Sequence, residues 1–570
     1  MSVKELYTEW CQKAVDDSDL LPELLEIENN DDEIRERFYR NLEFGTGGLR
    51  GVLGAGTNRM NVYTVRRATQ GLANYVKASF EKPSVAISYD SRIKSVQFAQ
   101  AAASVLAENG IQVHIYKELM PTPCLSWAVR ALGCSAGIMV TASHNPSKYN
   151  GYKAYGADGC QITLEVAEQV INEINSLDMF NDVKYCDFDK AVADGRVSYI
   201  SQDIIEEYYK NVLAQGIHTD LCAESGLKIV YTPLNGTGNK PVREVLSRIG
   251  IKDVTVVKEQ ENPDGHFPTC PYPNPEIREA LELGLQYCDK VKPDLLLATD
   301  PDADRVGIAV PDGDDYALFS GNEVGAMLLE YICSQRKANG TLPENPICVK
   351  TIVTTDLVKA IAKEYGVEVI EVLTGFKFIG EQIGLLEAKG EENRYVFGYE
   401  ESYGYLSGTY VRDKDAVVAS MLICEMAAYY RTQGISLIQA RENMYQKYGI
   451  FRHSLQSFEF DGESGMKKMN DLMQSLRDKH PETIGGLKVV SVSDYQTSET
   501  TNTLTGEKSE ITLPKSNVLV FDLEQGAKVV IRPSGTEPKI KSYYTAIGNT
   551  MEEAVATENK LKEDFSQIFK

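Results

Sequence analysis

Short apolar runs alternate with amphipathic segments along most of the chain. A β-branched run that ends in a polar or glycine-bearing turn and gives way to helical periodicity occurs at residues 83–92 (PSVAISYDSR), 227–238 (LKIVYTPLNGTG) and 345–356 (NPICVKTIVTTD). Strands that alternate with helices are joined by crossovers and form mostly parallel sheets covered by helices. The pattern therefore predicts three similar α/β domains with mostly parallel mixed sheets.

The two ends of the chain depart from this pattern. Residues 1–40 predict a polar, acidic helical segment. The glycines of 44–61 (FGTGGLRGVLGAGTNRMN) are too dense for a helix or a regular strand, which predicts a flexible loop that allows close approach. From about residue 455, strands follow one another in hairpin-like succession, as in a smaller C-terminal α+β domain. The predicted domains are 1–208, 209–325, 326–450 and 451–570.

Composition limits the classes of function. The 570 residues suggest three or four domains at about 150 residues each. A formal net charge of −23 repels nucleic acid and anionic membranes alike, so we expect neither as a partner. The 11 cysteines are scattered without metal-binding spacing, and no signal peptide or long apolar run is present, which predicts inert thiols and a cytoplasmic location. The sequence does not indicate the oligomeric state.

Three aspartates alternate directly after the apolar run DLLLAT. Asp300, Asp302 and Asp304 in DPDADR would repel one another without a cation, so a bound divalent metal is the simplest account. A calcium loop of the EF-hand type is excluded because Arg305 and Pro311 stand where glycine and glutamate are needed. Mg²⁺ fits better, since it is commonly held by carboxylates together with phosphate oxygens. An acidic turn without a metal is the alternative.

A serine that can receive a phosphate follows another apolar run, AGIMV. Ser143 lies in the polar loop TASHNP (141–146), although a lone loop serine is most often only solvated. Neither the Walker phosphate loop nor G-x-S-x-G occurs, which argues against a nucleotide motor and an elbow-type serine hydrolase. We interpret His144 as loop support or a phosphate contact rather than a triad base.

Two further segments carry groups suited to sugar hydroxyls. Glu400 and Ser402 in GYEESYG (398–404) are two positions apart, so in an extended segment both face one side. Thr374, Gly375 and Lys377 in LTGFKFIG provide similar groups. Each segment by itself is a weak signal, because polar turns are usually solvated.

RPSGTEPK (532–539) has the composition of a phosphate clamp. Arg532 and Lys539 provide cationic donors, Ser534 and Thr536 provide hydroxyls, and Gly535 lets backbone amides approach an oxyanion. A surface turn is the alternative. We predict that this segment binds a phosphate that is not being transferred.

Together, TASHNP, DPDADR, GYEES and RPSGTEPK resemble, in order and approximate spacing, the motifs of the alpha-D-phosphohexomutase family over nearly the whole chain. GYEESYG followed by VRDKDA (411–416) looks like the longer, glucose-directed members of that family. The resemblance implies an active site in a central cleft, in which phosphorylated Ser143 interconverts glucose 1-phosphate and glucose 6-phosphate. It also implies a glucose 1,6-bisphosphate intermediate, which acts as an activator as well, and Mg²⁺ bound by the three aspartates and the phosphoserine.

The resemblance also assigns roles to several cations. Arg50 and Lys153 are expected near Ser143, where they stabilise the transferring group or assist proton movement. Lys414 is either an acid or base on the sugar side or an exposed ion-pairing lysine. Arg305 is expected to contact the substrate, and Arg412 orients the substrate phosphate or only its own loop. Mannose- and pentose-directed enzymes of the family, and a catalytically silent sugar-phosphate-binding scaffold, are the alternative functions.

Overall fold

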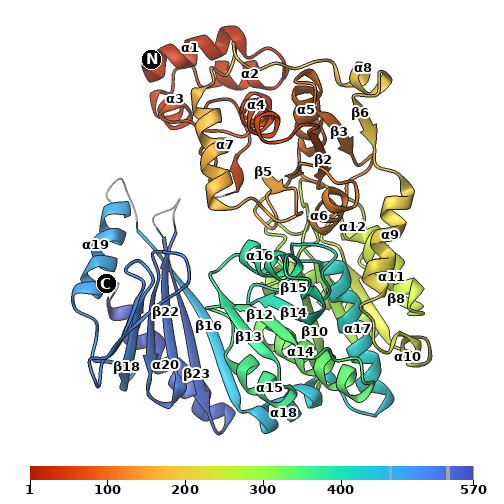
Figure 1. The fold of residues 1–570 in the computed structure, drawn as a ribbon, viewed down its shortest axis with the longest axis vertical. Coiled ribbons are helices and arrows are strands. Elements are labelled where there is room, and N and C mark those ends of the chain that lie inside the picture. The colour runs from red at the N-terminus through yellow and green to blue at the C-terminus, as the bar shows by residue number, and fades with distance from the viewer. Residues whose placement is uncertain (46, 461–464, 535–538, 569–570) are drawn as a thin grey trace. The chain divides into compact units, whose positions relative to one another are not determined.

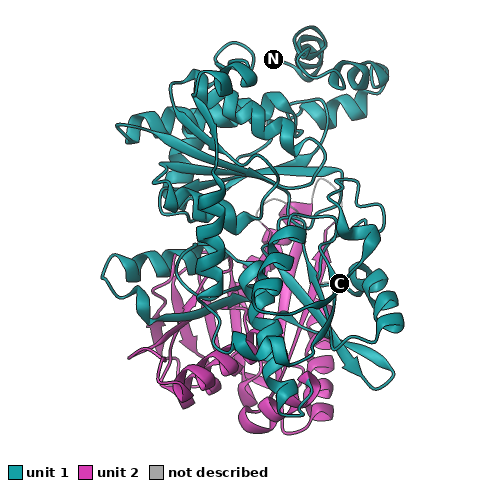
Figure 2. Cartoon of the chain, turned by 90° about the vertical axis from the view of Figure 1, so that its right-hand side faces the viewer, with its two compact units in different colours: residues 1–321, 376–436 teal, residues 322–375, 437–570 magenta. Residues whose placement is uncertain are grey.

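The computed structural model describes residues 1–45, 47–460, 465–534 and 539–568. Contacts divide the chain into two compact units. Unit 1 comprises residues 1–321 and 376–436, and unit 2 comprises 322–375 and 437–570 (Figure 2). No described helix combines the length and the apolarity needed to cross a membrane.

The first sheet of unit 1 has six strands in the order β1-β5-β4-β2-β3-β6. Strands β2, β3, β4 and β6 run parallel to their neighbours in that group, while β5 is antiparallel to β4 and to β1. Helices α4, α5 and α7 cover one face, and α6 packs on β2 and β4 (Figure 1). The bounds are β1 (Gly48–Val52), α4 (Val62–Ser79), β2 (Ser84–Tyr89), α5 (Ser95–Glu108), β3 (Gln112–Ile115), α6 (Thr122–Ala131), β4 (Ala136–Val140), β5 (Tyr149–Gly156), α7 (Leu164–Ser176), α8 (Phe188–Ala193) and β6 (Val197–Tyr199).

The second sheet of unit 1 has the order β11-β10-β9-β7-β8, with β7 parallel to β8 and β9 and the other pairs antiparallel. Its elements are α9 (Gln202–Leu213), α10 (Thr219–Glu224), β7 (Lys228–Thr232), α11 (Asn239–Arg248), β8 (Asp253–Val256), α12 (Lys258–Glu261), α13 (Arg278–Val291), β9 (Leu295–Thr299), β10 (Val306–Asp312) and β11 (Asp315–Phe319). The second segment of unit 1 contains α16 (Phe376–Glu387), η1 (Glu392–Arg394), the antiparallel pair β14 (Tyr395–Glu400) and β15 (Gly404–Leu406), and α17 (Ala416–Thr432).

Unit 2 combines an α/β segment with an antiparallel sheet. The α/β segment contains α14 (Gly321–Ala338), β12 (Ile347–Thr351), α15 (Leu357–Tyr365) and β13 (Glu368–Val372), with β12 and β13 parallel. The antiparallel sheet runs β16-β23-β22-β21-β18-β19-β20. The elements from residue 437 on are α18 (Leu437–Tyr448), β16 (Ile450–Glu459), α19 (Gly465–Asp478), β17 (Thr483–Ile484), β18 (Leu487–Asp494), β19 (Glu499–Asn502), β20 (Lys508–Glu510), β21 (Leu519–Leu523), η2 (Glu524–Gly526), β22 (Lys528–Pro533), β23 (Lys539–Gly548) and α20 (Met551–Ile568).

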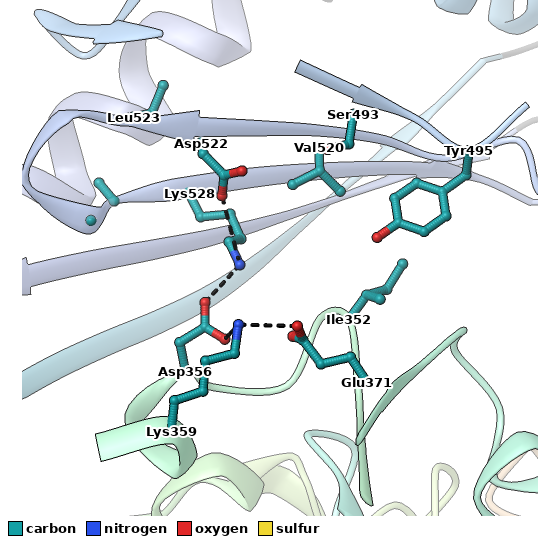
Figure 3. A pocket seen from close by; sticks show the side chains of 12 residues that line it. Ile352, Asp356, Lys359, Glu371, Ser493, Tyr495, Val520, Asp522, Leu523 and Lys528 are labelled. Atoms are coloured by element: carbon teal, nitrogen blue, oxygen red, sulfur yellow. Dashed lines mark hydrogen bonds and ion pairs between the residues drawn. The ribbon is translucent and has the colours of Figure 1, made fainter. Parts of the chain in front are cut away.

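An ion-pair network joins the α/β segment of unit 2 to its antiparallel sheet. Lys528 on β22 lies 2.6 Å from Asp356, the N-cap residue of α15, and 3.7 Å from Asp522 on β21. Lys359 on α15 lies 3.0 Å from both Asp356 and Glu371 (Figure 3). These side chains line a cavity of about 370 Å³.

The predicted fold class is confirmed, with one local correction. The apolar runs at 83–92, 227–238 and 345–356 contain β2, β7 and β12, and the C-terminal region is an antiparallel sheet with helices. The expectation that 44–61 contains no strand is wrong, because Gly48–Val52 forms β1 at the sheet edge. Gly48 has φ 155°, and a Cβ there would lie 2.0 Å from the Tyr152 carbonyl oxygen, so glycine is what lets β1 approach β5. The domain boundaries stay a prediction.

Candidate active site

The Ser143 hydroxyl lies against the first aspartate of DPDADR. Its Oγ donates to Asp300 Oδ2 at 3.0 Å and lies 3.2 Å from His144 Nδ1. Ser143 follows β4 and Asp300 follows β9, so two strand ends place these groups, as the sequence predicts. Ser143 has φ 52° and is only 5% exposed, and its N–H donates to Thr141 Oγ1 at 2.8 Å. The hydroxyl is therefore held in one place.

Arg92 fixes the loop that carries Ser143, a role that sequence reasoning missed. Its guanidinium donates to the carbonyl oxygens of Ser143 at 2.5 Å, Pro146 at 2.9 Å and Tyr149 at 3.0 Å, and also to that of Asn145. Burial lowers the pKa of Arg92 from its ordinary value, yet guanidinium stays charged at neutral pH. The available signal was the polar end of SYDSR, which follows β2 at the same sheet edge as TASHNP.

The three aspartates form a compact buried cluster. Asp300, Asp302 and Asp304 are at most 1% exposed, and one carboxylate oxygen of each lies within 4.8 Å of the others. Asp302 Oδ1 and Asp304 Oδ1 are buried without a hydrogen-bond partner among the described residues. Burial, and next the charges of Asp302 and Asp304, raise the pKa of Asp300 well above its ordinary value. Orphaned hard oxygens on clustered carboxylates fit a divalent cation such as Mg²⁺.

Two lysines partly compensate the acidic cluster. Lys153 Nζ lies 2.9 Å from Asp302 Oδ2, and Lys414 Nζ lies 3.1 Å from Asp304 Oδ2. Burial raises the pKa of Asp302, but Lys153, the hydrogen bond with Asp300 and Lys414 together outweigh it, so the net shift is downward. Burial likewise opposes the charged form of each lysine, but the carboxylates raise the pKa of both above the ordinary value. Both lysines are therefore cations at neutral pH.

Gly404 makes room for the Lys414 side chain. A Cβ at Gly404 would lie 2.1 Å from Lys414 Cδ, so any other residue at position 404 would obstruct the path to Asp304. Asp413 accepts from Lys414 Nζ at 2.9 Å and from the Tyr155 hydroxyl at 2.7 Å. Of the two alternatives for Lys414, the exposed lysine is wrong, because its side chain is mostly buried and contacts Asp304.

The Arg412 side chain contacts its own loop and the end of helix α16. Its side chain is fully buried, its Nη2 donates to Glu387 at 2.6 Å, and its Nη1 donates to the carbonyl oxygens of Thr409 and Val411. Its backbone N–H donates to Ser126 Oγ at 2.9 Å. These contacts describe the alternative in which Arg412 supports the loop.

Cations surround His144. Burial, followed by the charges of Arg305 and Arg50, lowers the pKa of His144 well below its ordinary value, so the imidazole is neutral at pH 7. Arg50 lies on β1 opposite Gly151. Arg305 follows the aspartate cluster and donates to Glu276. Burial opposes the charge of Arg305, but Glu276 and Asp304 outweigh it and raise its pKa.

The predicted sugar-binding residues lie in two segments of the chain, around residues 400 and 375. Glu400 is the buried last residue of β14, so this strand extends further into GYEES than the sequence suggests, and Ser402 follows in the turn to β15. Burial opposes the charge of Lys414, but Asp304, Asp413 and then Glu400 raise its pKa. Lys377 lies in the first turn of α16 in unit 1 and has a pKa lowered by burial. Thr374 and Gly375 end the first segment of unit 2.

The described residues of the predicted phosphate clamp lie on or next to the antiparallel strands β22 and β23 in unit 2. Arg532 is on β22, and the Ser534 N–H donates to the Lys539 carbonyl at 2.7 Å, which closes the two strand ends. Lys539 Nζ lies 3.0 Å from Glu459. Gly535 and Thr536 lie outside the described residues.

Comparison with known proteins agrees with this geometry. Residues 41–180, 206–313 and 320–448 match the models of the phosphoglucomutase/phosphomannomutase alpha/beta/alpha domains I, II and III. The chain is 38% identical to the phosphoglucomutase of Staphylococcus saprophyticus, covering 88% of this chain and 90% of that protein. It is 38% identical to the phosphoglucomutase of Staphylococcus aureus strain USA300, covering 94% of both.

Solved structures share the fold. A putative phosphomannomutase from Thermus thermophilus aligns with TM-score 0.68 and 23% identity, covering 93% of this chain and 99% of that one. The phosphoglucomutase parafusin from Paramecium, in an open form, aligns with TM-score 0.69 and 18% identity, covering 93% and 95%. The chain belongs to the phosphoglucomutase/phosphomannomutase family, that is, to the alpha-D-phosphohexomutases. It is thus an isomerase that acts as an intramolecular phosphotransferase.

Proposed function

We propose that the protein is a phosphoglucomutase that interconverts α-D-glucose 1-phosphate and glucose 6-phosphate through phosphorylated Ser143. The observation that carries this proposal is the 3.0 Å contact between Ser143 Oγ and the aspartate cluster, with two orphaned carboxylate oxygens beside it. The 38% identity to phosphoglucomutases over most of the chain supports glucose as the sugar.

The reaction consists of two phosphoryl transfers. In the first, the bond between Ser143 Oγ and phosphorus breaks as the free hydroxyl of the sugar monophosphate bonds to that phosphorus and releases its proton to solvent. Glucose 1,6-bisphosphate results, which also serves as the activator. After the sugar reorients, Ser143 Oγ receives the other phosphoryl group and the sugar hydroxyl regains a proton.

A Mg²⁺ ion would be held by Asp300, Asp302, Asp304 and the phosphorylated Ser143, and it would neutralise charge on the phosphoryl oxygens. The protein's own groups provide positioning and further charge stabilisation. Lys153 and Lys414 act as cations and hydrogen-bond donors, because the neighbouring carboxylates raise their pKa and keep both ammonium groups protonated.

Substrate contacts complete the proposal. Arg50, His144 and Arg305 surround the transferring phosphoryl group, and Glu400 and Ser402 bind sugar hydroxyls, with Arg412 as support of the adjoining loop. Further sugar contacts are assigned to Thr374, Gly375 and Lys377. The phosphate that is not reacting is bound by Arg532, Ser534, Gly535, Thr536 and Lys539. The partner is a small sugar phosphate, and the location proposed from the free, scattered cysteines is the cytoplasm.

An assay of the purified protein with Mg²⁺ and glucose 1,6-bisphosphate tests this proposal. The panel is glucose, mannose, ribose and glucosamine 1-phosphates, and the highest kcat/KM is expected for glucose. Ser143→Ala should abolish turnover, whereas Ser147→Ala, in the same loop, should retain it. A higher kcat/KM for mannose or ribose would reassign the substrate, and normal turnover by Ser143→Ala would refute the phosphoserine mechanism. A wild-type protein inactive on every sugar would identify a silent scaffold.

A further inference from the structure

The N-terminal helices pack on the domain that carries Ser143. Residues 1–40, here called the N-terminal brace, form α1 (Val3–Lys13), α2 (Leu20–Glu26) and α3 (Asp31–Phe38). The family model for domain I begins after them, at residue 41. Trp10 of α1 is 1% exposed and makes edge contacts at 5.6 Å with Tyr63 of α4 and with Phe180. The brace is therefore part of the core of this domain.

Polar groups of the brace bind the backbone of one loop. Residues 53–60, here called the glycine loop, connect β1 to α4. Glu23 Oε2 accepts the Ala55 N–H at 2.9 Å, and its Oε1 accepts from Arg37. The carbonyl oxygen of Arg37 in turn accepts the Asn58 N–H at 2.9 Å. The loop is thus hydrogen-bonded to α2 and α3 at several backbone positions.

The glycines of this loop allow the backbone to approach the brace closely. Gly54 has φ 140°, and a Cβ there would lie 2.5 Å from Glu23 Oε1. Gly56 has φ 128°, and a Cβ there would lie 2.7 Å from the Arg37 carbonyl oxygen. A side chain at either position would push the brace away. The close approach expected from the sequence is confirmed, and the group approached is the brace.

The glycine loop is hydrogen-bonded to the two segments that carry Ser143 and Arg50. The Leu53 N–H donates to the carbonyl oxygen of Lys148 at 2.8 Å, in the segment that follows Ser143. The Met60 N–H donates at 2.8 Å to the carbonyl oxygen of Val52, the last residue of the strand that carries Arg50. A displacement of the loop therefore shifts β1 and the phosphoserine loop together.

We propose that the N-terminal brace is a positioning element for phosphoryl transfer, with Glu23 as its main contact to the glycine loop. This inference rests on the proposed function. Glu23 touches no reacting group, and it acts through Ala55 and Leu53 on the placement of Arg50 relative to Ser143. Small misplacements of reacting groups reduce a rate strongly while leaving substrate affinity almost unchanged.

Three variants separate positioning from general stability. Glu23→Leu removes the acceptor for the Ala55 N–H, whereas Glu23→Gln keeps an amide oxygen there. Glu33→Leu is the matched control, because Glu33 pairs with the same Arg37, at 3.2 Å, but makes no described bond to the glycine loop. The measurements are kcat, KM, the rate of Ser143 phosphorylation by glucose 1,6-bisphosphate, and amide hydrogen exchange at Leu53 and Ala55.

For Glu23→Leu we expect about a tenfold fall in kcat and in Ser143 phosphorylation with KM within about twofold, and near-normal values for Glu23→Gln and Glu33→Leu. Amide exchange at Leu53 and Ala55 should accelerate about tenfold in Glu23→Leu alone. Unchanged kcat in Glu23→Leu, or an equal fall in Glu33→Leu, would overturn the proposal. If the wild type turns over no sugar phosphate, the proposed function fails by itself, and unchanged exchange at Leu53 in Glu23→Leu then decides against the brace.

Discussion

Replacing Asp300 by asparagine should make the metal-free protein more stable while destroying its metal site. Asparagine keeps an oxygen that accepts the backbone N–H groups of Asp304 and Arg305, which Asp300 Oδ1 accepts at 3.1 and 3.0 Å. It removes the carboxyl group whose ionisation would place a third negative charge in the buried cluster. The substitution thus changes charge with little change in shape.

The magnitude follows from the spacing of the cluster. Carboxylate oxygens within 4.8 Å of one another repel by about 3.5 kcal/mol per pair at an effective dielectric constant of about 20. Lys153 and Lys414 offset this for Asp302 and Asp304, so the repulsion falls mainly on Asp300. We expect the free energy of unfolding of metal-free Asp300→Asn to exceed that of the wild type by about 2 kcal/mol at pH 7. This is the part of the carboxylate repulsion that remains after partial screening. For the wild type, Mg²⁺ at about 100 times its Kd should contribute about 2.7 kcal/mol.

The assay is thermal unfolding of both proteins in EDTA and in Mg²⁺ from about pH 5 to about pH 8. Burial and the neighbouring charges raise the folded-state pKa of Asp300 above its unfolded value, so the folded protein retains a proton that the unfolded chain has lost. Stability of the metal-free wild type therefore falls as pH rises above about 4, and this contribution is absent from Asp300→Asn. Asp312→Asn, at an exposed carboxylate ending β10, is the control.

Two results would refute this reasoning. If Asp300→Asn were no more stable than the wild type in EDTA, the claim that charge repulsion in the cluster destabilises the metal-free protein would be wrong. If Mg²⁺ raised the Tm of the variant as much as that of the wild type, Asp300 would not be a ligand.

The other predictions concern three charged residues. Lys414→Met should lower kcat about 100-fold with KM nearly unchanged, because a cation that contacts Asp304 is lost. Steady-state kinetics measure both constants, and a change in KM without a change in kcat would contradict the prediction. Arg92→Lys should slow Ser143 phosphorylation about tenfold, since one ammonium cannot bind all the carbonyl groups that the guanidinium binds. A normal rate of phosphorylation in rapid-quench experiments would contradict the role of Arg92 in fixing the Ser143 loop. Asp356→Asn should destabilise unit 2 by about 2 kcal/mol at pH 7, because the fully buried Lys350 loses a carboxylate 3.1 Å away. Burial opposes the charge of Asp356, but Lys350 and its neighbours hold its pKa below the ordinary value. The difference in the free energy of unfolding between wild type and variant should therefore be full above about pH 4 and vanish as the pH falls further. Urea unfolding at several pH values measures this difference, and a difference that does not change with pH would be inconsistent with the ion pairs.

The groups that the sequence located correctly share one property: they follow apolar strands directly. AGIMV and DLLLAT form β4 and β9, so Ser143 and Asp300 lie at strand ends and meet at 3.0 Å. The spacing of hydrophobic positions and the residues of turns are local properties of the chain. A strand end that carries polar residues can therefore be recognised in a single sequence.

The contacts that the sequence did not reveal depend on side chains crossing between elements. Lys414 reaches Asp304 only because Gly404, earlier in the chain, leaves space for its side chain. Arg92 binds carbonyl oxygens of the Ser143 loop from the turn after β2, which no spacing rule indicates. Glycine-rich composition predicted a flexible, close-approach loop around Gly54, but it did not indicate that the group approached is the Glu23 carboxylate. Such contacts require the tertiary structure.

The most direct test of the central claim is mass analysis of the enzyme after mixing with glucose 1,6-bisphosphate and Mg²⁺, followed by excess glucose 6-phosphate. The account predicts that one phosphoryl group appears on the peptide containing Ser143, and that a phosphoryl group from this serine is recovered in sugar bisphosphate when the monophosphate is added. A turnover-competent enzyme that never carries phosphate on Ser143, or carries it on another residue, would contradict the account.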